Sequence, residues 1–336
     1  MHNNKGAHHV MNVAICGLGM MGQTHAHCYV QRPNTKLIAI ADMDSSRLHM
    51  DFVDMSSIRC YSDIDLLLKD PDVDVVSVCA PTPWHAPMVT RALAAGKFVL
   101  CEKPMAANMQ DIESILSASR SAPGKLMIAQ VIRFWDAYVQ TRQIVNENRL
   151  GQVITARFYR NGPLPHWSEW YRSEASGGVV VDLVSHCINY AQWLFGSPRK
   201  VRAIGSPFYE QERGLECVHG ILDMEHLQVH VHGGWYPVDS YPFQMGFEIV
   251  CDQGTIAFDS RLGNNVTLFR KDQPEEILES KGTDAYYAEI DYFLTCIEEN
   301  RPVSRCPPEE SAMTVQIALA LNESRRKNGA EITISD

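Results

Sequence analysis

The chain has 336 residues, 45% of them hydrophobic and 21% charged, and a formal net charge of −10 at pH 7. This length predicts about two domains, each able to bury a core. The acidic balance argues against nucleic acid or an anionic membrane as a partner, since both bind basic surfaces. No apolar stretch approaches the roughly 20 residues that span a bilayer.

The N-terminus and the cysteines favour a cytoplasmic protein. Residues 1–10 are polar and lack the apolar core of a signal peptide. The ten cysteines include no CxxC pair, and Cys16, Cys79 and Cys101 lie in or beside apolar runs. Buried thiols in a reducing compartment explain this distribution more simply than disulfides or zinc.

The first part of the chain alternates strand and helix patterns. Apolar runs cover residues 13–16, 37–41, 75–80, 98–101 and 126–131, and helical patterns include 85–95 and 111–120. Such alternation predicts an α/β fold, with a doubly wound parallel sheet of the Rossmann type in a first domain, residues 1–131.

The second part is richer in strand patterns. These cover residues 153–159, 200–204, 227–235, 247–250, 255–258 and 266–269, and helices are expected at about 136–148, 180–194, 284–299 and 309–327. Several strands alternate apolar and polar residues, which predicts an open, mostly antiparallel sheet in an α+β second domain, residues 132–336. The closing helix, 309–327, is a candidate to pack back on the first domain.

A glycine-rich turn follows the first apolar run and carries the pattern GxGxxG. Gly17 permits a tight turn, Gly19 lets the backbone approach a pyrophosphate, and Gly22 lets the helix pack close to the strand. The start of the helix then offers N–H groups to phosphate. The predicted dinucleotide contacts here are Gly17, Gly19, Met20, Met21 and Gly22.

A carboxylate at the end of the second strand indicates the type of cofactor. Asp42 follows Gly22 by 20 positions and comes directly after the run 37–41. A carboxylate there accepts hydrogen bonds from a ribose 2′-OH and repels a 2′-phosphate. Asp44 adds negative charge, and the nearest arginine is Arg47. NAD is therefore favoured over NADP.

The tripeptide Glu102-Lys103-Pro104 follows the fourth strand. Ligands of such sheets bind beyond the carboxyl ends of the strands, where a lysine can donate to a substrate oxygen. Asp182 and His186 are four apart in a helical pattern, so the carboxylate can fix the imidazole tautomer. Taken alone, a lysine at a strand end is more often a surface residue, and an Asp–His pair is more often a structural hydrogen bond.

The whole pattern resembles the glucose–fructose oxidoreductase, inositol dehydrogenase and rhizopine-catabolism (Gfo/Idh/MocA) family. The most specific matches are the stretches AGKFVLCEKP, ending at Pro104, and WYRSEASGGVVVDLVSH, from Trp170 to His186. Further matches are the turn at 13–22, Pro81-Thr82-Pro83 with His85, Arg133-Phe134 and Asp252-Gln253-Gly254-Thr255. The resemblance covers essentially the whole chain.

The resemblance implies a role for each matching residue. Lys103 and His186 handle the proton of the substrate hydroxyl, with His186 as general base oriented by Asp182, or alternatively with Lys103 as the acid–base group. Pro81, Thr82, His85, Glu102 and Lys103 lie beside the dinucleotide. Substrate contacts are expected from Lys103, Arg133, Trp167, Arg172, Asp182 and His186.

Three positions depart from the family pattern. Val179 and Val184 stand where glycines are frequent, and Asn189 stands where an acid is frequent. The loss of that charge means that polyol contacts cannot be carried over from the family. In the loop 161–172, aromatic residues and Arg172 suit a sugar or cyclitol, although packing explains the tryptophans equally well.

His226, His230 and His232 alternate along one predicted strand. Imidazoles on one sheet face can bind a metal, but a solvated or subunit-facing surface is the simpler interpretation, and no metal site is predicted. The resemblance implies a homodimer or homotetramer that forms through this open sheet face.

The predicted function is an NAD-dependent dehydrogenase that oxidises a secondary alcohol of a sugar, sugar derivative or cyclitol. Two alternatives stay open. One is a glycosidase of the same family that uses NAD transiently, and the other is a non-catalytic protein that senses NAD. The presence of Lys103, Asp182 and His186 together argues against the latter.

Overall fold

The computed structural model describes residues 10–164, 176–205 and 217–334. Its described residues form two compact units. The first unit contains the chain up to Glu102, Glu113–Ala129 and Tyr286–Pro308, and the second contains Lys103–Ile112, Gln130–Ala285 and the chain from Glu309 on. The domain limits 1–131 and 132–336, and the packing of the helix 309–327 on the first domain, stay predictions.

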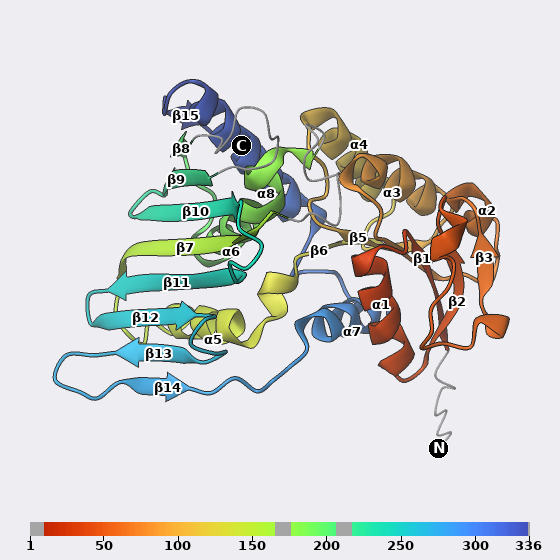
Figure 1. Cartoon of the computed structure of the whole chain (residues 1–336), viewed down its shortest axis with the longest axis horizontal. Helices are drawn as coiled ribbons and strands as arrows, with labels where there is room; N and C mark the ends of the chain where they lie inside the picture. The colour runs from red at the N-terminus through yellow and green to blue at the C-terminus, as the bar shows by residue number, and fades with distance from the viewer. Residues whose placement is uncertain (1–9, 165–175, 206–216, 335–336) are drawn as a thin grey trace, which may run out of the picture. The chain divides into compact units, whose positions relative to one another are not determined.

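The first unit is built on a six-stranded parallel sheet with strand order β3-β2-β1-β4-β5-β6 (Figure 1). This is the order of a doubly wound nucleotide-binding sheet. The strands are β1 (Met11–Cys16), β2 (Thr35–Ala41), β3 (Arg59–Tyr61), β4 (Val75–Val78), β5 (Phe98–Glu102) and β6 (Leu126–Ala129). Strands β4 and β6 are buried along their whole length, as the continuous apolar runs indicate.

Helices connect these strands. They are α1 (Met20–Gln31), α2 (Ile64–Leu68), α3 (His85–Ala94) and α4 (Met109–Ser121), with short 3₁₀ turns η1 (Ser45–Arg47), η2 (Met55–Ser57) and η3 (Thr82–Trp84). The helix α7 (Ala285–Glu298) comes much later in the chain and belongs to the first unit from Tyr286 on. Arg32, after α1, binds Asp291 and Glu298 of α7 at 2.9 and 2.8 Å. This buried guanidinium anchors α7 to the first unit although α7 is distant in sequence.

The second unit is built on a nine-stranded sheet with strand order β14-β13-β12-β11-β7-β10-β9-β8-β15. Only the described residues enter this order, and within it β10 and β7 pair parallel whereas the other neighbours pair antiparallel. The strands are β7 (Val153–Pro163), β8 (Lys200–Ile204), β9 (Cys217–Asp223), β10 (Gln228–Tyr236), β11 (Gln244–Cys251), β12 (Gly254–Asp259), β13 (Val266–Phe269), β14 (Glu276–Leu278) and β15 (Ile332–Thr333). The predicted fold class is therefore confirmed for both sheets.

One face of this sheet carries the core. Helices α5 (Asp136–Asn146), α6 (Ser185–Phe195) and α8 (Pro308–Arg326) contribute Tyr138, Tyr190 and Leu321 to a cluster with the sheet residues Phe158 and Phe247. The hydroxyl of Tyr190 donates to the carbonyl of Tyr138 at 2.8 Å, so this buried phenol is satisfied.

The helix expected at about 180–194 is divided in two. A π-helical turn, η7, covers Val180–Val184, and the α-helix α6 begins at Ser185. A short 3₁₀ turn, η4 (Val131–Phe134), precedes α5. π turns change the angular spacing of side chains and occur frequently at functional sites.

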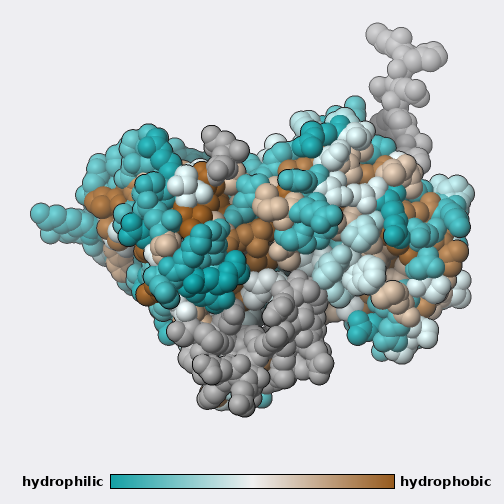
Figure 2. All heavy atoms as spheres, turned by 90° about the horizontal axis from the view of Figure 1, so that it is seen from above, coloured by the Kyte–Doolittle hydropathy of each residue, from teal (hydrophilic) through white to brown (hydrophobic). Residues whose placement is uncertain are grey.

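No helix among the described residues is long and apolar enough to cross a membrane. Figure 2 shows one face of the molecule, over which hydrophilic and hydrophobic residues are interspersed. Highly exposed apolar side chains such as Leu262 and Met43 are single residues in turns or bends. Scattered residues of this kind need no binding partner to explain them.

We expect Phe247→Ala to lower the free energy of unfolding by about 3–5 kcal/mol, because it leaves a cavity in the aromatic core. Phe247 is fully buried and its ring lies 5.3 Å from that of Tyr138. Urea denaturation followed by circular dichroism measures the change. Phe269→Ala, at a position 44% exposed, is the control, with an expected loss of about 1 kcal/mol or less. Equal losses in the two variants would contradict this account of the core.

Candidate functional site

The glycine turn after β1 is so closely packed that two of its positions exclude a side chain. Gly17 has φ +89°, and a Cβ there would lie 2.8 Å from the backbone of Cys79 and Ala80. A Cβ on Gly22 would lie 2.0 Å from the carbonyl oxygen of Gly17. The turn therefore passes directly against the segment that follows β4, and α1 packs directly against the turn.

The remaining glycine of the pattern faces open space. A Cβ on Gly19 would meet nothing within 4 Å, and Gly19 is the residue before α1 begins at Met20. The first turn of α1 has no acidic residue, and its N–H groups have no partner within the helix. Space and N–H donors at a helix N-terminus fit a pyrophosphate.

Asp42 is held in place by the same turn. Its Oδ2 accepts a hydrogen bond from the N–H of Leu18 at 2.7 Å, and its Oδ1 accepts one from the N–H of Asp44 at 2.9 Å. Each carboxylate oxygen has a second lone pair that can accept from a hydroxyl. The geometry therefore fits a dinucleotide with a free ribose 2′-OH.

The other residues expected near the dinucleotide differ in exposure. Pro81 is exposed, whereas Thr82, His85 and Glu102 are buried. The Nε2–H of His85 donates to the carbonyl of Ala80 at 2.7 Å, and Glu102 pairs with Nε2 of His25 at 3.0 Å. These contacts fix the segments that follow β4 and β5, and cofactor contact by these residues stays a prediction.

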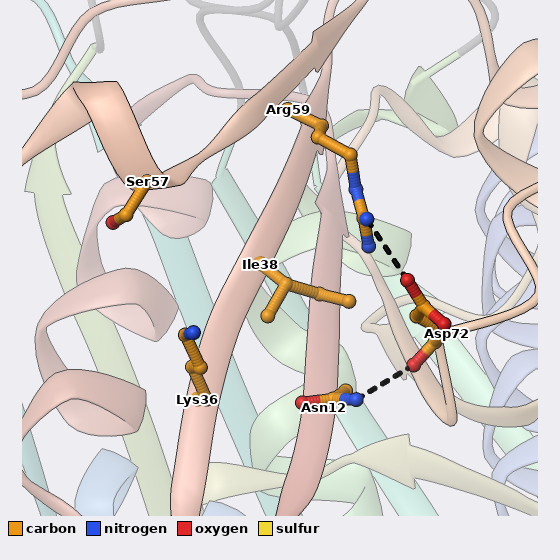
Figure 3. A pocket seen from close by; sticks show the side chains of 6 residues that line it. All are labelled: Asn12, Lys36, Ile38, Ser57, Arg59 and Asp72. Atoms are coloured by element: carbon orange, nitrogen blue, oxygen red, sulfur yellow. Dashed lines mark hydrogen bonds and ion pairs between the residues drawn. The ribbon is translucent and has the colours of Figure 1, made fainter.

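A surface hollow in the first unit lies near the amino ends of the strands, whereas the glycine turn follows the carboxyl end of β1 (Figure 3). It is lined by Asn12, Lys36, Ile38, Ser57, Arg59 and Asp72. Most of these residues stand at or near the amino ends of β1, β2 and β3, whereas ligands of such sheets bind at the carboxyl ends. Arg59 and Asn12 already bind Asp72, at 3.0 and 2.9 Å, so we do not assign this hollow to the cofactor.

Lys103 and Asp182 meet within the second unit. The ammonium of Lys103 lies 3.1 Å from Oδ1 of Asp182 and donates to the backbone carbonyl of the same residue at 3.0 Å. Lys103 directly follows the last residue of β5, and Asp182 belongs to the π turn η7. A lysine with two oxygen acceptors on one residue is held in a defined position, unlike a solvated surface lysine.

His186 does not bind Asp182, contrary to the pairing expected from an i, i+4 spacing. The expectation fails because the π turn changes the angular offset that an α-helix would give these two residues. His186 is buried, and its Nδ1 has no hydrogen-bond partner among the described residues. Burial, and then the charges of Arg160 and Lys103, hold the pKa of His186 well below its usual value, so the imidazole is neutral at pH 7.

Arg160 is a residue that the sequence analysis missed. It lies on β7, two positions after the core residue Phe158, and is 8% exposed. Its Nε is buried without a partner among the described residues, and its guanidinium lies 5.0 Å from the ring centroid of Phe243. The sequence did contain a sign of this residue, because Arg160 is a charged residue at a position where the alternation of the strand predicts a core-facing side chain.

Arg133, expected to contact substrate, is fully buried and binds side chains of the second unit. Its Nε donates to Oδ1 of Asn189 at 2.7 Å, and its Nη1 pairs with Glu310. The side-chain amide of Asn189 in turn donates to Thr314 at 3.0 Å. Substrate contact by Arg133 stays a prediction. Trp167 and Arg172 lie outside the described residues.

The histidine stripe is arranged differently from the expectation. β10 begins at Gln228, so His226 precedes the strand, with a side chain 86% exposed. His219 of β9 takes the third place instead, with its ring 5.9 Å from that of His230 and 4.4 Å from that of His232. Antiparallel pairing of β9 with β10 places His219 directly opposite His232.

Two family models match the chain. One is described as an oxidoreductase family with an NAD-binding Rossmann fold and matches residues 11–130. The other, the GFO/IDH/MocA C-terminal domain, matches residues 138–257. Together they include the described strands from β1 to β11 and the residues Gly17, Asp42, Lys103, Asp182 and His186.

Curated relatives match along almost the full chain. The chain is 26% identical over 326 residues to the uncharacterized oxidoreductase YrbE of Bacillus subtilis, covering 92% of this chain and 93% of that protein. It is 25% identical over 330 residues to the myo-inositol 2-dehydrogenase of Thermotoga maritima, covering 95% and 96%.

A solved structure of levoglucosan dehydrogenase with NADH and levoglucosan has the same fold. It matches with a TM-score of 0.86 at 19% identity, and the match covers 97% of this chain and 100% of that chain. The predictions of an oxidoreductase and of NAD as cofactor are confirmed by the family models. The chain belongs to the Gfo/Idh/MocA family of NAD-binding oxidoreductases.

Proposed function

We propose that this enzyme oxidises a secondary alcohol of a sugar, sugar derivative or cyclitol, with Lys103 and His186 handling the hydroxyl proton. The observation that carries the proposal is the ammonium of Lys103, fixed on the carboxylate and the backbone carbonyl of Asp182 directly after the carboxyl end of β5. The relatives named inositol 2-dehydrogenase and levoglucosan dehydrogenase support this substrate class.

Lys103 is the proposed donor to the substrate oxygen. Its position is set by Asp182, so the carboxylate orients the lysine rather than the imidazole. An ammonium aimed at the hydroxyl oxygen stabilises negative charge as the proton leaves. NAD, held by the glycine turn and Asp42, would supply the redox chemistry as the acceptor of a hydride from the carbinol carbon.

His186 is the proposed proton acceptor. A neutral imidazole has one nitrogen lone pair, and the low pKa caused by burial, Arg160 and Lys103 keeps this form at physiological pH. Because Lys103 remains the alternative acid–base group, the pH dependence must distinguish the two residues. Arg160 is a further proposed substrate contact, since its buried guanidinium suits hydroxyl oxygens.

We expect Lys103→Met to lower kcat for NADH formation by about 10²–10⁴-fold, because a positioned proton-handling group is lost. The assay screens sugars and cyclitols with NAD, and with NADP in parallel, for release of reduced cofactor. Lys36→Met, at an exposed position of the first unit, is the control and should keep full activity. Unchanged turnover in Lys103→Met would remove the proposed donor, and product without net NADH would favour the glycosidase alternative.

The pH dependence of kcat/KM tests His186. Activity should persist as pH falls through the usual pKa of a histidine, about 6.5, and decline only at lower pH, when the imidazole becomes protonated. Arg160→Gln removes a positive neighbour, so the pKa of His186 should rise and the acid limb should move to higher pH. Arg157→Gln, an exposed change on the same strand, should leave the limb in place. If the pH profile of His186→Asn keeps the same decline in kcat/KM at low pH, Lys103 or another group is the base.

Asp42→Ala should raise the Kd of NAD by about ten- to a hundredfold, since hydrogen bonds to a charged group contribute about 1.5–3 kcal/mol. It should also narrow the preference for NAD over NADP, because the repulsion of a 2′-phosphate is removed. Fluorescence titration with NADH and NADPH measures both. Asp51→Ala removes the same charge at a fully exposed position and is the control. An unchanged NADH to NADPH ratio would contradict the role of Asp42.

A further inference from the structure

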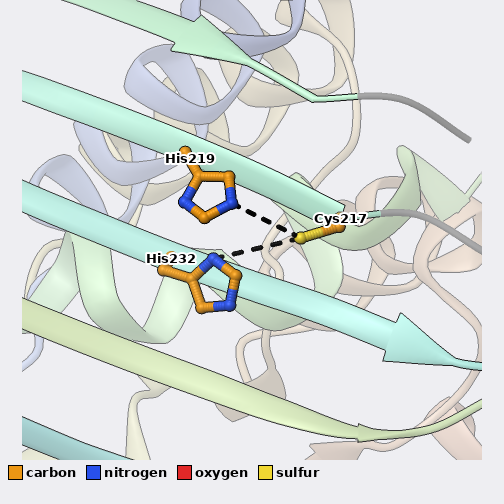
Figure 4. Close-up of side chains that lie close together, drawn as sticks. All are labelled: Cys217, His219 and His232. Atoms are coloured by element: carbon orange, nitrogen blue, oxygen red, sulfur yellow. Dashed lines mark hydrogen bonds between the residues drawn. The ribbon is translucent and has the colours of Figure 1, made fainter.

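Three side chains of metal-binding type meet on the outer face of the second sheet. Cys217 and His219 come from β9 and His232 from β10, and one ligand atom of each lies within 4.8 Å of the others (Figure 4). None of them belongs to the proposed active site.

The pairing of the two strands brings these residues together. His219 and His232 are directly opposite each other, and Cys217 stands opposite Gly234. Residues two apart on a strand share a face, so Cys217 projects on the same side as His219. Since Gly234 has no side chain, the space beside the thiol is left to the imidazole of His232.

The distances are close to those of a zinc site. The Sγ of Cys217 lies 3.8 Å from Nε2 of His219 and 4.0 Å from Nδ1 of His232. Tetrahedral zinc with a Zn–S bond of about 2.3 Å and Zn–N bonds of about 2.0–2.1 Å places sulfur and nitrogen about 3.5 Å apart. Small rotations of the three side chains close the difference.

The surroundings of His232 suit a metal ligand. Its Nδ1 lies 3.1 Å from the carbonyl of Val218 and its Nε2 lies 3.4 Å from the hydroxyl of Tyr236. At this distance the Nδ1–H of His232 donates to the carbonyl of Val218. Metal binding through Nδ1 replaces that hydrogen bond, and the tautomer with hydrogen on Nε2 can then donate to Tyr236.

We propose that Cys217, His219 and His232 bind one divalent transition-metal ion of the zinc class, with water as the fourth ligand. One Zn–S and two Zn–N bonds form, and the thiol proton of Cys217 passes to solvent. A thiolate with two imidazoles selects zinc over magnesium or calcium, which take oxygen ligands. The ion links the first residue of β9 to β10, so its role is to fix the start of β9.

The sequence alone indicated no metal site, because a solvated or subunit-facing surface was the simpler interpretation of His226, His230 and His232. The sulfur ligand is distant in sequence from His232, and the antiparallel pairing that joins them is not a local pattern. The described structure supplies the third ligand by placing β9 beside β10.

Cobalt binding tests the site through its spectrum. The full chain is used with His2, His8 and His9 changed to alanine, to remove competing N-terminal imidazoles, and with a phosphine reductant in place of thiols. We expect one equivalent of Co²⁺ per chain, a thiolate-to-cobalt charge-transfer band in the near ultraviolet, and displacement of the band by Zn²⁺. Elemental analysis gives the stoichiometry.

Three substitutions and two controls decide the outcome. Cys217→Ser should abolish the charge-transfer band, and His219→Gln and His232→Gln should each weaken Co²⁺ binding by at least about tenfold. Cys60→Ser and His226→Gln change an exposed cysteine and an exposed histidine and should bind normally. His219 is exposed, so His219→Gln keeps the test valid if Cys217→Ser misfolds. A band that survives Cys217→Ser, or no band in the parent chain, overturns the proposal.

Discussion

The ammonium of Lys103 is fixed by two oxygens of a single residue, one from the carboxylate and one from the backbone carbonyl of Asp182. This contact requires two supports. The end of β5 sets the start of the lysine, and the π turn η7 sets the aspartate. Two glycines leave the space that the valines of η7 occupy. A Cβ on Gly177 would lie 2.6 Å from Val181, and a Cβ on Gly233 would lie 2.4 Å from Val184. The position of one charged group thus depends on close backbone packing at two distant places in the chain.

The sequence could predict those parts of the site that local backbone geometry demands. Gly17 and Gly22 could be identified because no other residue type fits their positions, and Asp42 follows from the length of one βαβ unit. The three-residue strand β3 was missed because its pattern is too short to show a period. The pairing of Asp182 with His186 was wrong because a π turn has no clear sequence signature. The partner of Lys103 depends on tertiary contacts that spacing cannot reveal.

At position 189, the residue that departs from the family pattern has hydrogen-bond partners inside the second unit. The amide of Asn189 accepts from Arg133 through its oxygen and donates to Thr314 through its nitrogen. A carboxylate at this position has no N–H to donate to Thr314. The buried arginine is neutralised instead by Glu310. An asparagine therefore completes a hydrogen-bond network of the second unit, in which both its oxygen and its nitrogen have partners.

The strands β7, β9 and β10 carry different chemistry on their two faces. On the helix-covered face, Phe158 and Arg160 alternate with residues that point outward, and a Cβ on Gly220 would lie within 4 Å of both Val231 and Leu321. On the outer face, His219 and His232 lie opposite each other. Because side chains of a strand alternate, a shift of one residue in the pairing would exchange these two sets. The buried valines at 218, 229 and 231 hold the register. The apolar core therefore determines both which charged side chains reach the interior and which ligand atoms meet on the open surface.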